Sequence, residues 1–397
     1  MSCPNWSLEE LNVWRLYGRL DERIRDLLRP HQMSWPSDEL ELAASFSSLQ
    51  RSFQHQRRHL LPQSLVAAAL SRPHQVPDWA FQWLRSQVDL GSLGLSLSWE
   101  IACSMKWMLF PTALADESRG LIYRVLAGYK EGAPAEAGFP TWWPKTADEE
   151  ALKSVRIAMN LLGLHGEGGF HFLPIIPFTA KRLFHGTSLG LPFYLAGYGL
   201  CRGFAPEGIL ATGGIGEDGS LLLAGGLPMK AAAASGDGLK ALLCPLSSET
   251  KTAQSEPVER IEVESLQEAC FIWELYKPGE GNDLQSDFKS MADTSRLAAN
   301  AHLLSKRSLS SGIVAEEYSK KVEAVLEDRD LARQLLDNLE RMADSPEYPA
   351  REMDALLAPF SPERARSLAA GNPVAAFRAF INLLLTPRVV CDNRIMT

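Results

Sequence analysis

Residues near the middle of the chain have the types and spacing needed to hydrolyse an acyl bond. Ser188 stands between Gly186 and Gly190, and the apolar segment 191–200 that follows predicts a helix. The glycines allow a tight turn and the close approach of a substrate, and the free N–H groups at a helix start can bind an oxyanion. A nucleophilic serine fits this pattern, although the same pattern also occurs by chance or as a helix N-cap.

A base for this serine is available further along the chain. Lys230 follows the segment 225–229, Gly-Gly-Leu-Pro-Met, and precedes the four alanines 231–234. Such surroundings would remove water from the ammonium and lower its pKa, so that the neutral amine can act as a general base. The alternative is a solvated lysine in front of an alanine-rich helix. His185 is a weaker candidate for the base, because a residue three positions before the serine need not face it.

Taken together, these motifs resemble the proteolytic domain of the Lon proteases. That family carries Asp-Gly-Pro-Ser-Ala-Gly, then Thr-Gly-Glu-Ile, then Gly-Gly-Leu-Lys-Glu-Lys. This chain has His-Gly-Thr-Ser-Leu-Gly at 185–190, Thr-Gly-Gly-Ile at 212–215 and Gly-Gly-Leu-Pro-Met-Lys at 225–230. The resemblance covers about residues 146–277, and the three motifs fall in the family's order. It departs from the family at His185, Thr187, Leu189 and Gly214, which replace Asp, Pro, Ala and Glu.

The resemblance implies a Ser-Lys dyad. In it, Ser188 is the nucleophile and Lys230 the general base and later the acid. Thr212 matches a threonine near the dyad, where its hydroxyl could orient the lysine amine; a strand-end threonine that satisfies the backbone is the alternative. Backbone N–H groups around Ser188 would meet the oxyanion, with Thr187 or Leu189 contributing.

We further expect Gly186 and the strand residues Phe170, His171 and Phe172 to contact an extended peptide substrate. A buried core strand is the alternative for Phe170 to Phe172. Neither a cofactor nor a metal is expected, because the sequence contains no phosphate-binding loop, no G-x-G-x-x-G after a strand and no H-E-x-x-H. A Lon-like enzyme without an ATP-binding motif would act independently of ATP.

The predicted fold class is α+β, a Lon-type proteolytic domain flanked by mainly helical domains. Residues 1–145 are expected to be mainly helical, 146–280 to form the protease domain and 281–397 to be helical. Within the protease domain we predict a helix opened by a capping box at 146–149, strands at 170–174, 239–245 and 258–263, and a helix at 265–276.

Composition narrows the class of protein. Of the 397 residues, 46% are hydrophobic and 22% charged, and the formal net charge is −8. These are ordinary globular values, and the acidic balance disfavours a general nucleic-acid coat. The six cysteines are scattered, which predicts reduced packing residues. No apolar run reaches membrane-spanning length, and residues 1–10 do not resemble a signal peptide, so a cytoplasmic protein is expected.

The sequence therefore predicts an ATP-independent Lon-like serine endopeptidase. It would cleave a specific partner or unfolded protein, under control of helical flanks on which an activator or target docks; oligomerisation is left open. The alternative is a non-proteolytic Lon-fold scaffold that binds partner proteins. A nucleic-acid binder using the basic run Arg51–His59 is a third and weaker possibility.

Overall fold

The computed structural model describes residues 60–71, 73, 76, 78–115, 120–132, 137–163, 168–176, 184–246, 258–277, 303–304, 308 and 311–327. The chain divides into two compact units, Met1–Val258 and Glu259–Thr397. The basic run Arg51–His59, the rest of the region before residue 60 and most of the region 281–397, both expected to be helical, lie outside the described residues. Within the described part, helices and strands are mixed, as the α+β prediction requires.

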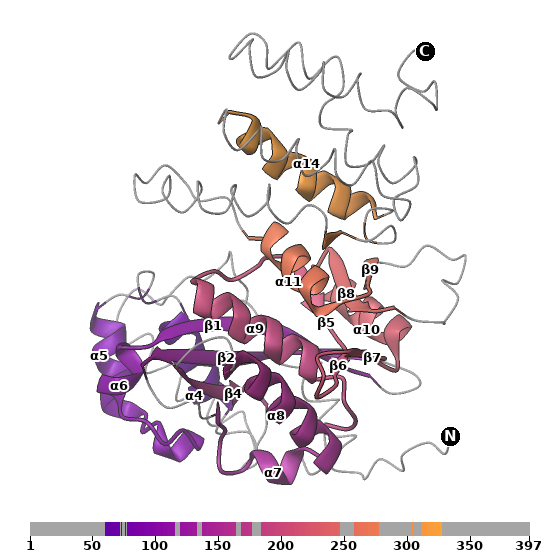
Figure 1. Ribbon diagram of the computed structural model, residues 1–397. Coiled ribbons are helices and arrows are strands. Elements are labelled where there is room, and N and C mark those ends of the chain that lie inside the picture. The colour runs from indigo at the N-terminus through magenta and orange to yellow at the C-terminus, as the bar shows by residue number, and fades with distance from the viewer. Residues whose placement is uncertain are drawn as a thin grey trace, which may run out of the picture. The chain divides into compact units, whose positions relative to one another are not determined.

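The described part of the first unit contains both helices and strands (Figure 1). Its helices are α4 (Leu60–Ser71), α5 (Asp78–Gln87), the 3-10 helix η2 (Gly91–Leu93), α6 (Trp99–Cys103), α7 (Trp143–Thr146), α8 (Glu149–Gly163), α9 (Gly190–Arg202) and α10 (Leu227–Gly236). Its strands are β1 (Lys106–Ala115), β2 (Gly120–Glu131), β3 (Ala137–Gly138), β4 (Gly168–Pro174), β5 (Ile209–Ala211), β6 (Gly214–Ile215), β7 (Leu221–Leu222) and β8 (Ala241–Pro245).

The larger sheet has the strand order β1-β2-β4-β3. β2 pairs antiparallel with β1 and with β4, and the short β3 pairs parallel with β4. Because β2 is buried without interruption from Tyr123 to Tyr129, both of its faces are covered. α4 packs against β1, and α9 and α10 pack against β1 and β2.

This sheet corrects the domain boundary expected at residue 145. Leu126 and Ala127 of β2 pair with Leu173 and Phe172 of β4, so the sheet joins residues from both sides of that boundary. The region 1–145 also contributes two long strands to it, and is less purely helical than expected. At the other end, the division at Val258 places the predicted segment 259–277 in the second unit.

Aromatic side chains fill the core between this sheet and α9. Phe193 of α9 is fully buried, and its ring lies 4.9 Å from Phe172 of β4 and 5.5 Å from Phe110 of β1, measured between centroids. Phe184 packs in the same way, 4.7 Å from Trp143 and 5.0 Å from Tyr123. Edge-on and tilted ring pairs of this kind add to the burial energy, so this cluster fixes α9 and the residues that precede it.

Smaller strands surround the glycine-rich motifs. β5 pairs parallel with β8, and β6 forms an antiparallel hairpin with β7. α10 packs its apolar stripe, Leu227, Ala231 and Ala234, on a cluster that includes Leu210 of β5 and Leu242 of β8. The predicted strand 239–245 and helix 191–200 are thus confirmed, with bounds shifted by one or two residues.

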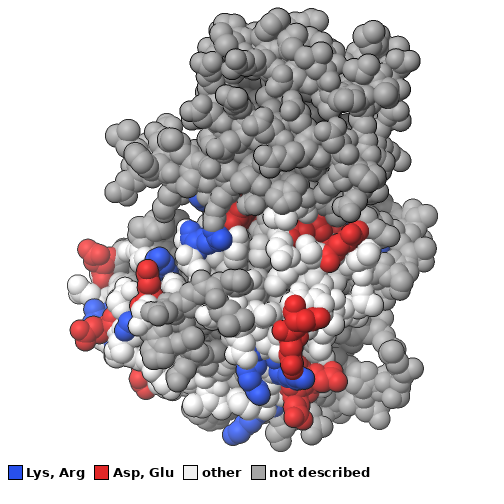
Figure 2. Space-filling view, in the orientation of Figure 1, with Lys and Arg blue, Asp and Glu red and all other residues white. Residues whose placement is uncertain are grey.

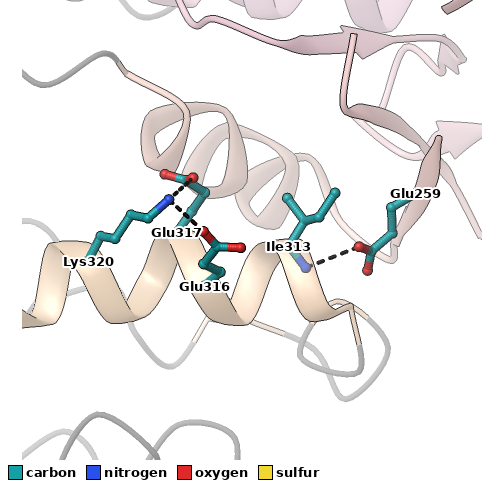
Figure 3. Close-up of polar contacts among 5 residues, drawn as sticks. All are labelled: Glu259, Ile313, Glu316, Glu317 and Lys320. Atoms are coloured by element: carbon teal, nitrogen blue, oxygen red, sulfur yellow. Dashed lines mark hydrogen bonds and ion pairs between the residues drawn. The ribbon is translucent and has the colours of Figure 1, made fainter. Parts of the chain in front are cut away.

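The second unit contains β9 (Glu259–Val263), α11 (Leu266–Leu275) and α14 (Gly312–Glu327). α11 begins where predicted, because the Ser265 hydroxyl accepts the Glu268 N–H at 3.1 Å as an N-cap. Figure 3 shows that Glu259 reaches the start of α14, where its carboxylate accepts the Ile313 N–H at 3.1 Å. On the exposed side of α14, Lys320 bridges Glu316 and Glu317 at 2.8 and 2.9 Å.

The surface carries charges of both signs. Figure 2 shows Lys and Arg interspersed with Asp and Glu on the face in view. Pairs such as Lys153 with Glu217 at 3.2 Å are exposed and add little stability. Of the four cysteines described, Cys244 and Cys270 are buried, whereas Cys103 and Cys201 are exposed, contrary to the packing role expected for them. No described helix is long and apolar enough to cross a membrane.

Candidate active site

Lys230 lies on the buried face of α10, three residues after Leu227 and one before Ala231. Only 3% of its surface is exposed. Burial lowers the pKa of its amine to about 8, an effect that the electrostatic interaction with Cys244 partly opposes. The predicted removal of water from Lys230 is confirmed, and the solvated alternative is wrong. A substantial fraction of this amine is therefore neutral near physiological pH.

The hydroxyl of Thr212 holds the lysine amine. Lys230 Nζ donates a hydrogen bond to Thr212 Oγ1 at 2.8 Å, and both residues are buried. Thr212 directly follows β5, and its N–H donates to the Leu243 carbonyl of β8 at 2.9 Å. Its backbone is thus fixed by the sheet, while its side chain is free to orient the amine, as expected of this residue.

Ser188 lies in the turn that enters α9. Gly186 opens this turn with a φ of +71°, a conformation in which a side chain would be strained. Leu189 is the N-cap of α9 and is buried, whereas Ser188 and Thr187 are half-buried. The serine is therefore accessible at the start of a helix whose remaining first turns are packed in the core.

Gly213 joins the serine turn to the lysine. Its N–H donates to the Ser188 carbonyl at 3.0 Å, and its carbonyl accepts the Leu191 N–H at 2.8 Å. Thr212, the residue before Gly213, binds the amine of Lys230. The two neighbouring residues therefore contact both the backbone of Ser188 and the amine of Lys230. A side chain at Gly213 would be strained by its φ of +147°, and its Cβ would lie 2.5 Å from Pro245 Cδ.

The two members of the predicted dyad are connected through this segment, and no direct hydrogen bond joins them. Among the described residues, Ser188 Oγ makes no hydrogen bond, and Lys230 Nζ makes only the one to Thr212. The N–H groups of Ser188 and Leu189 also donate to no acceptor in this part of the chain. Two unpaired donors at the start of a helix can bind an oxyanion, as predicted for the backbone near Ser188.

Helix α8 supports the serine turn through two residues that the sequence analysis missed. The hydroxyl of Ser154 is buried and donates to the Thr187 carbonyl at 2.6 Å. Asp148 accepts the Gly186 N–H at 3.2 Å and lies 3.4 Å from His185 Nδ1. His185, the weaker candidate for the base, is thus paired with a carboxylate.

Asp148 is also the N-cap of α8, because it accepts the Ala151 N–H at 2.7 Å. The capping box predicted at 146–149 is therefore wrong in detail, since Thr146 ends α7 and donates instead to the Trp143 carbonyl. Acidic residues at the start of a predicted helix were visible in the sequence, but the second role of Asp148 depends on tertiary contact.

β2 contacts both ends of α10, the helix that carries Lys230. Gly120 at the start of β2 lies directly against the main-chain carbonyl of Met229, next to Lys230. Arg124, which is 8% exposed, pairs with Asp237 at the end of α10. Nothing in the sequence signals these contacts, because the partners are more than a hundred residues apart.

Thr187 and Gly214, two positions at which this chain differs from the Lon motifs, lie against each other. A Cβ built on Gly214 would lie 2.7 Å from Thr187 Oγ1 and 2.8 Å from Thr187 Cβ. A side chain at 214, such as the family's Glu, therefore cannot coexist with Thr187 in its present position. The absence of a side chain at Gly214 therefore leaves the space that the Thr187 side chain occupies.

The strand predicted to bind substrate is part of the core. Phe170 and Phe172 are 4% and 0% exposed. β4 is paired at Phe170 and His171 on both sides, with β2 and with β3, so the backbone there has no free edge for a peptide. Burial and proximity to Lys130 lower the pKa of His171. The expected role of this strand in binding is corrected to a structural one, whereas Gly186 does lie in the serine turn.

No group of three or more His, Cys, Asp or Glu residues that could hold a metal ion occurs among the described residues. No family model matches the sequence, and no curated protein matches it. The chemistry of the site therefore has to be inferred from its own geometry.

Proposed function

We propose that this protein is an ATP-independent, Lon-like serine endopeptidase that uses Ser188 and Lys230. The observation that carries the proposal is the buried Lys230 amine, with a pKa of about 8, bound to Thr212 at 2.8 Å beside the glycine that binds the Ser188 backbone. Burying a lysine without a paired opposite charge lowers the free energy of unfolding. A buried group whose pKa is shifted in this way is a candidate for acid-base chemistry.

In the proposed reaction, Lys230 takes the proton of the Ser188 hydroxyl while the serine oxygen attacks the peptide carbonyl. The N–H groups of Ser188 and Leu189 bind the oxyanion of the tetrahedral intermediate. Lys230 then gives its proton to the leaving amine, and the C–N bond breaks to leave an acyl-serine. Water, activated by the neutral Lys230, hydrolyses this ester and restores the enzyme.

The proton transfer requires Ser188 Oγ to come within hydrogen-bond reach of Lys230 Nζ. Catalytic hydrogen bonds are often long before substrate binds and shorten in the complex. Thr212 keeps the amine oriented in the meantime. Without an ATP-driven motor, the enzyme would cleave exposed or unfolded segments or one specific partner, and the regions on either side of the site would dock the activator or target.

The test is cleavage of an unstructured protein, casein, by the wild type and by Ser188→Ala and Lys230→Ala, together with labelling by a serine-reactive probe. We expect cleavage and labelling by the wild type, and loss of both in each variant. The assay is repeated with cell lysate as a source of activator. Lys240→Ala is the matched control, because Lys240 is an exposed lysine of the same unit.

A second function is favoured by one observation, the lack of a direct bond between Ser188 and Lys230. A chain with this arrangement could be a scaffold that binds partner proteins without cleaving them. Absence of both cleavage and labelling, with and without lysate, would overturn the protease proposal in favour of the scaffold.

A further inference from the structure

We propose that Ser154 is a positioning residue for the oxyanion, because its hydroxyl fixes the direction of the peptide unit that carries the Ser188 N–H. This inference rests on the proposed function, and it names the residue that prepares the oxyanion donors of that site. Ser154 lies on α8, outside the three sequence motifs that carry the dyad.

The Ser154 hydroxyl is used outside its own helix. A serine inside a helix commonly bonds a carbonyl of the preceding turn of that helix. Ser154 instead donates to the Thr187 carbonyl at 2.6 Å, near the short end of the range for a hydroxyl donor, and only 2% of the residue is exposed. The hydrogen bond is therefore short, buried and directed at the turn that carries the nucleophile.

The Thr187 carbonyl is held by two donors. Besides the Ser154 hydroxyl, it accepts the Gly190 N–H at 3.1 Å, so one donor comes from α8 and the other from the first residue of α9. In a trans peptide unit the carbonyl and the N–H point in opposite directions. Because the carbonyl of this unit is directed at α8, the Ser188 N–H is directed away from α8.

The next peptide unit is fixed in the same manner. The Ser188 carbonyl accepts the Gly213 N–H at 3.0 Å, so the Leu189 N–H points away from Gly213. Neither the Ser188 N–H nor the Leu189 N–H bonds to an acceptor in the part of the chain that the structure describes. The carbonyls of both units are thus bonded to buried residues, which leaves the two N–H groups for an oxyanion.

Gly190 makes room for the contact between Ser154 and the turn. A Cβ on Gly190 would lie 2.5 Å from Ser154 Oγ and 3.0 Å from the Ile215 nitrogen. Gly190 has no positive φ, so space rather than backbone conformation requires a glycine there. The glycine two residues after the nucleophile therefore serves the approach of Ser154 to the turn.

Loss of the Ser154 hydroxyl should turn the peptide unit and weaken binding of the transition state. Removal of a complete oxyanion donor lowers kcat about 100- to 1000-fold. Since Gly190 still holds the Thr187 carbonyl, we expect Ser154→Ala to lower kcat for casein about 30-fold and to leave KM within about twofold. A peptide boronic acid forms a tetrahedral adduct with a nucleophilic serine, so its inhibition constant should rise about 30-fold as well.

Two further substitutions separate the hydroxyl from the space that it fills. Threonine and valine have nearly the same shape, so any crowding of Gly190 by the extra methyl group is common to both. Ser154→Thr keeps the hydroxyl, and it should be at least about tenfold more active than Ser154→Val.

Val155→Ala is the control for a change in the stability of α8. Val155 is the next residue of the same helix, and only 1% of it is exposed. Its truncation should lower the thermal midpoint at least as much as Ser154→Ala does, and should leave kcat within about twofold. A loss of kcat in Val155→Ala as large as that in Ser154→Ala would mean that the helix, and not the hydroxyl, is responsible, and would overturn the inference.

Crystal structures of the wild type and Ser154→Ala report the direction of the Thr187 carbonyl whether or not the protein cleaves casein. We expect this carbonyl to turn away from α8 in the variant. A carbonyl that keeps its direction would overturn the inference, and so would equal rates in Ser154→Thr and Ser154→Val beside an active wild type; both results leave the protease in place. A wild type that neither cleaves casein nor binds the boronic acid, with a turned carbonyl in Ser154→Ala, would overturn the proposed hydrolysis and support Ser154 as the residue that orients this peptide unit.

Discussion

Lys230 and Thr212 form a buried pair in which the amine is held at 2.8 Å by a hydroxyl rather than by a carboxylate. A carboxylate partner would favour the charged ammonium and raise its pKa, whereas a neutral hydroxyl leaves burial as the main influence. The pairing therefore orients the amine and still allows a pKa of about 8. This combination is what a lysine needs in order to exchange protons near neutral pH.

Loss of the Thr212 hydroxyl should reduce the rate without disturbing the fold. We expect Thr212→Val to lower kcat about 100-fold, because the amine loses its fixed direction, and to leave KM little changed. Thr212→Ser should keep most of the activity, since the hydroxyl remains. The measurement is steady-state peptide hydrolysis by both variants. Equal rates in Thr212→Val and wild type would mean that the hydroxyl serves the backbone alone.

The labelling rate at Ser188 should depend on pH in the way that a lysine base dictates. Only the neutral amine of Lys230 can accept a proton, so the rate should rise about tenfold per pH unit below the pKa and level off above about 8. Labelling with a serine-reactive probe, quenched at set times and repeated between pH 6 and 10, measures this profile. A midpoint far from 8 would show that Lys230 is not the base.

Replacement of Lys230 by an apolar residue should stabilise the protein. The fall of its pKa from 10.5 to about 8 corresponds to roughly 3 kcal/mol of unfavourable burial below pH 8. Loss of the hydrogen bond to Thr212 offsets about 1 kcal/mol of this amount. The free energy of unfolding of Lys230→Met should therefore be about 2 kcal/mol higher than that of the wild type at pH 7. Urea unfolding of the wild type and the variant measures the difference.

The sign of the pH effect provides the control for this prediction. Between pH 8 and 10.5 the unfolded state binds more protons at this site than the folded state, so the stability of the wild type rises with pH. The advantage of Lys230→Met should therefore shrink at pH 10. The exposed Lys240 should behave differently, and Lys240→Met should change stability by less than about 0.5 kcal/mol at either pH.

A side chain at Gly213 should displace the nucleophile. Gly213→Ala places a Cβ 2.5 Å from Pro245 Cδ on a backbone with a φ of +147°, so the segment must move and its bonds to Ser188 and Leu191 must lengthen. We expect labelling of Ser188 to fall about 100-fold and the unfolding free energy to fall by about 1–3 kcal/mol. Gly225→Ala is the matched control, because nothing lies within 4 Å of a Cβ there.

The sequence predicted those parts of the site that are local in the chain. The turn at Ser188, helix α9 and the buried Lys230 follow from glycine spacing and apolar runs, which act over a few residues. β1 and β2 were not foreseen as a pair. Phe170 and Phe172 were assigned to substrate, with a core strand as the alternative, and they are buried in the core. Ser154 and Arg124 were missed for the same reason, since only the folded chain brings them to Thr187 and Asp237.

The contacts of β2 with both ends of α10 determine how the chain can be shortened. A fragment that begins at residue 146 would lack Gly120 and Arg124, so it would expose the Met229 carbonyl and leave Asp237 without its cation. It would also lack the strand that pairs with β4. Inactivity of such a fragment would reflect a missing half of the scaffold, and would say nothing about inhibition or activation by the flanking regions. Experiments on regulation should therefore keep residues 106–131 and remove sequence only outside the sheet.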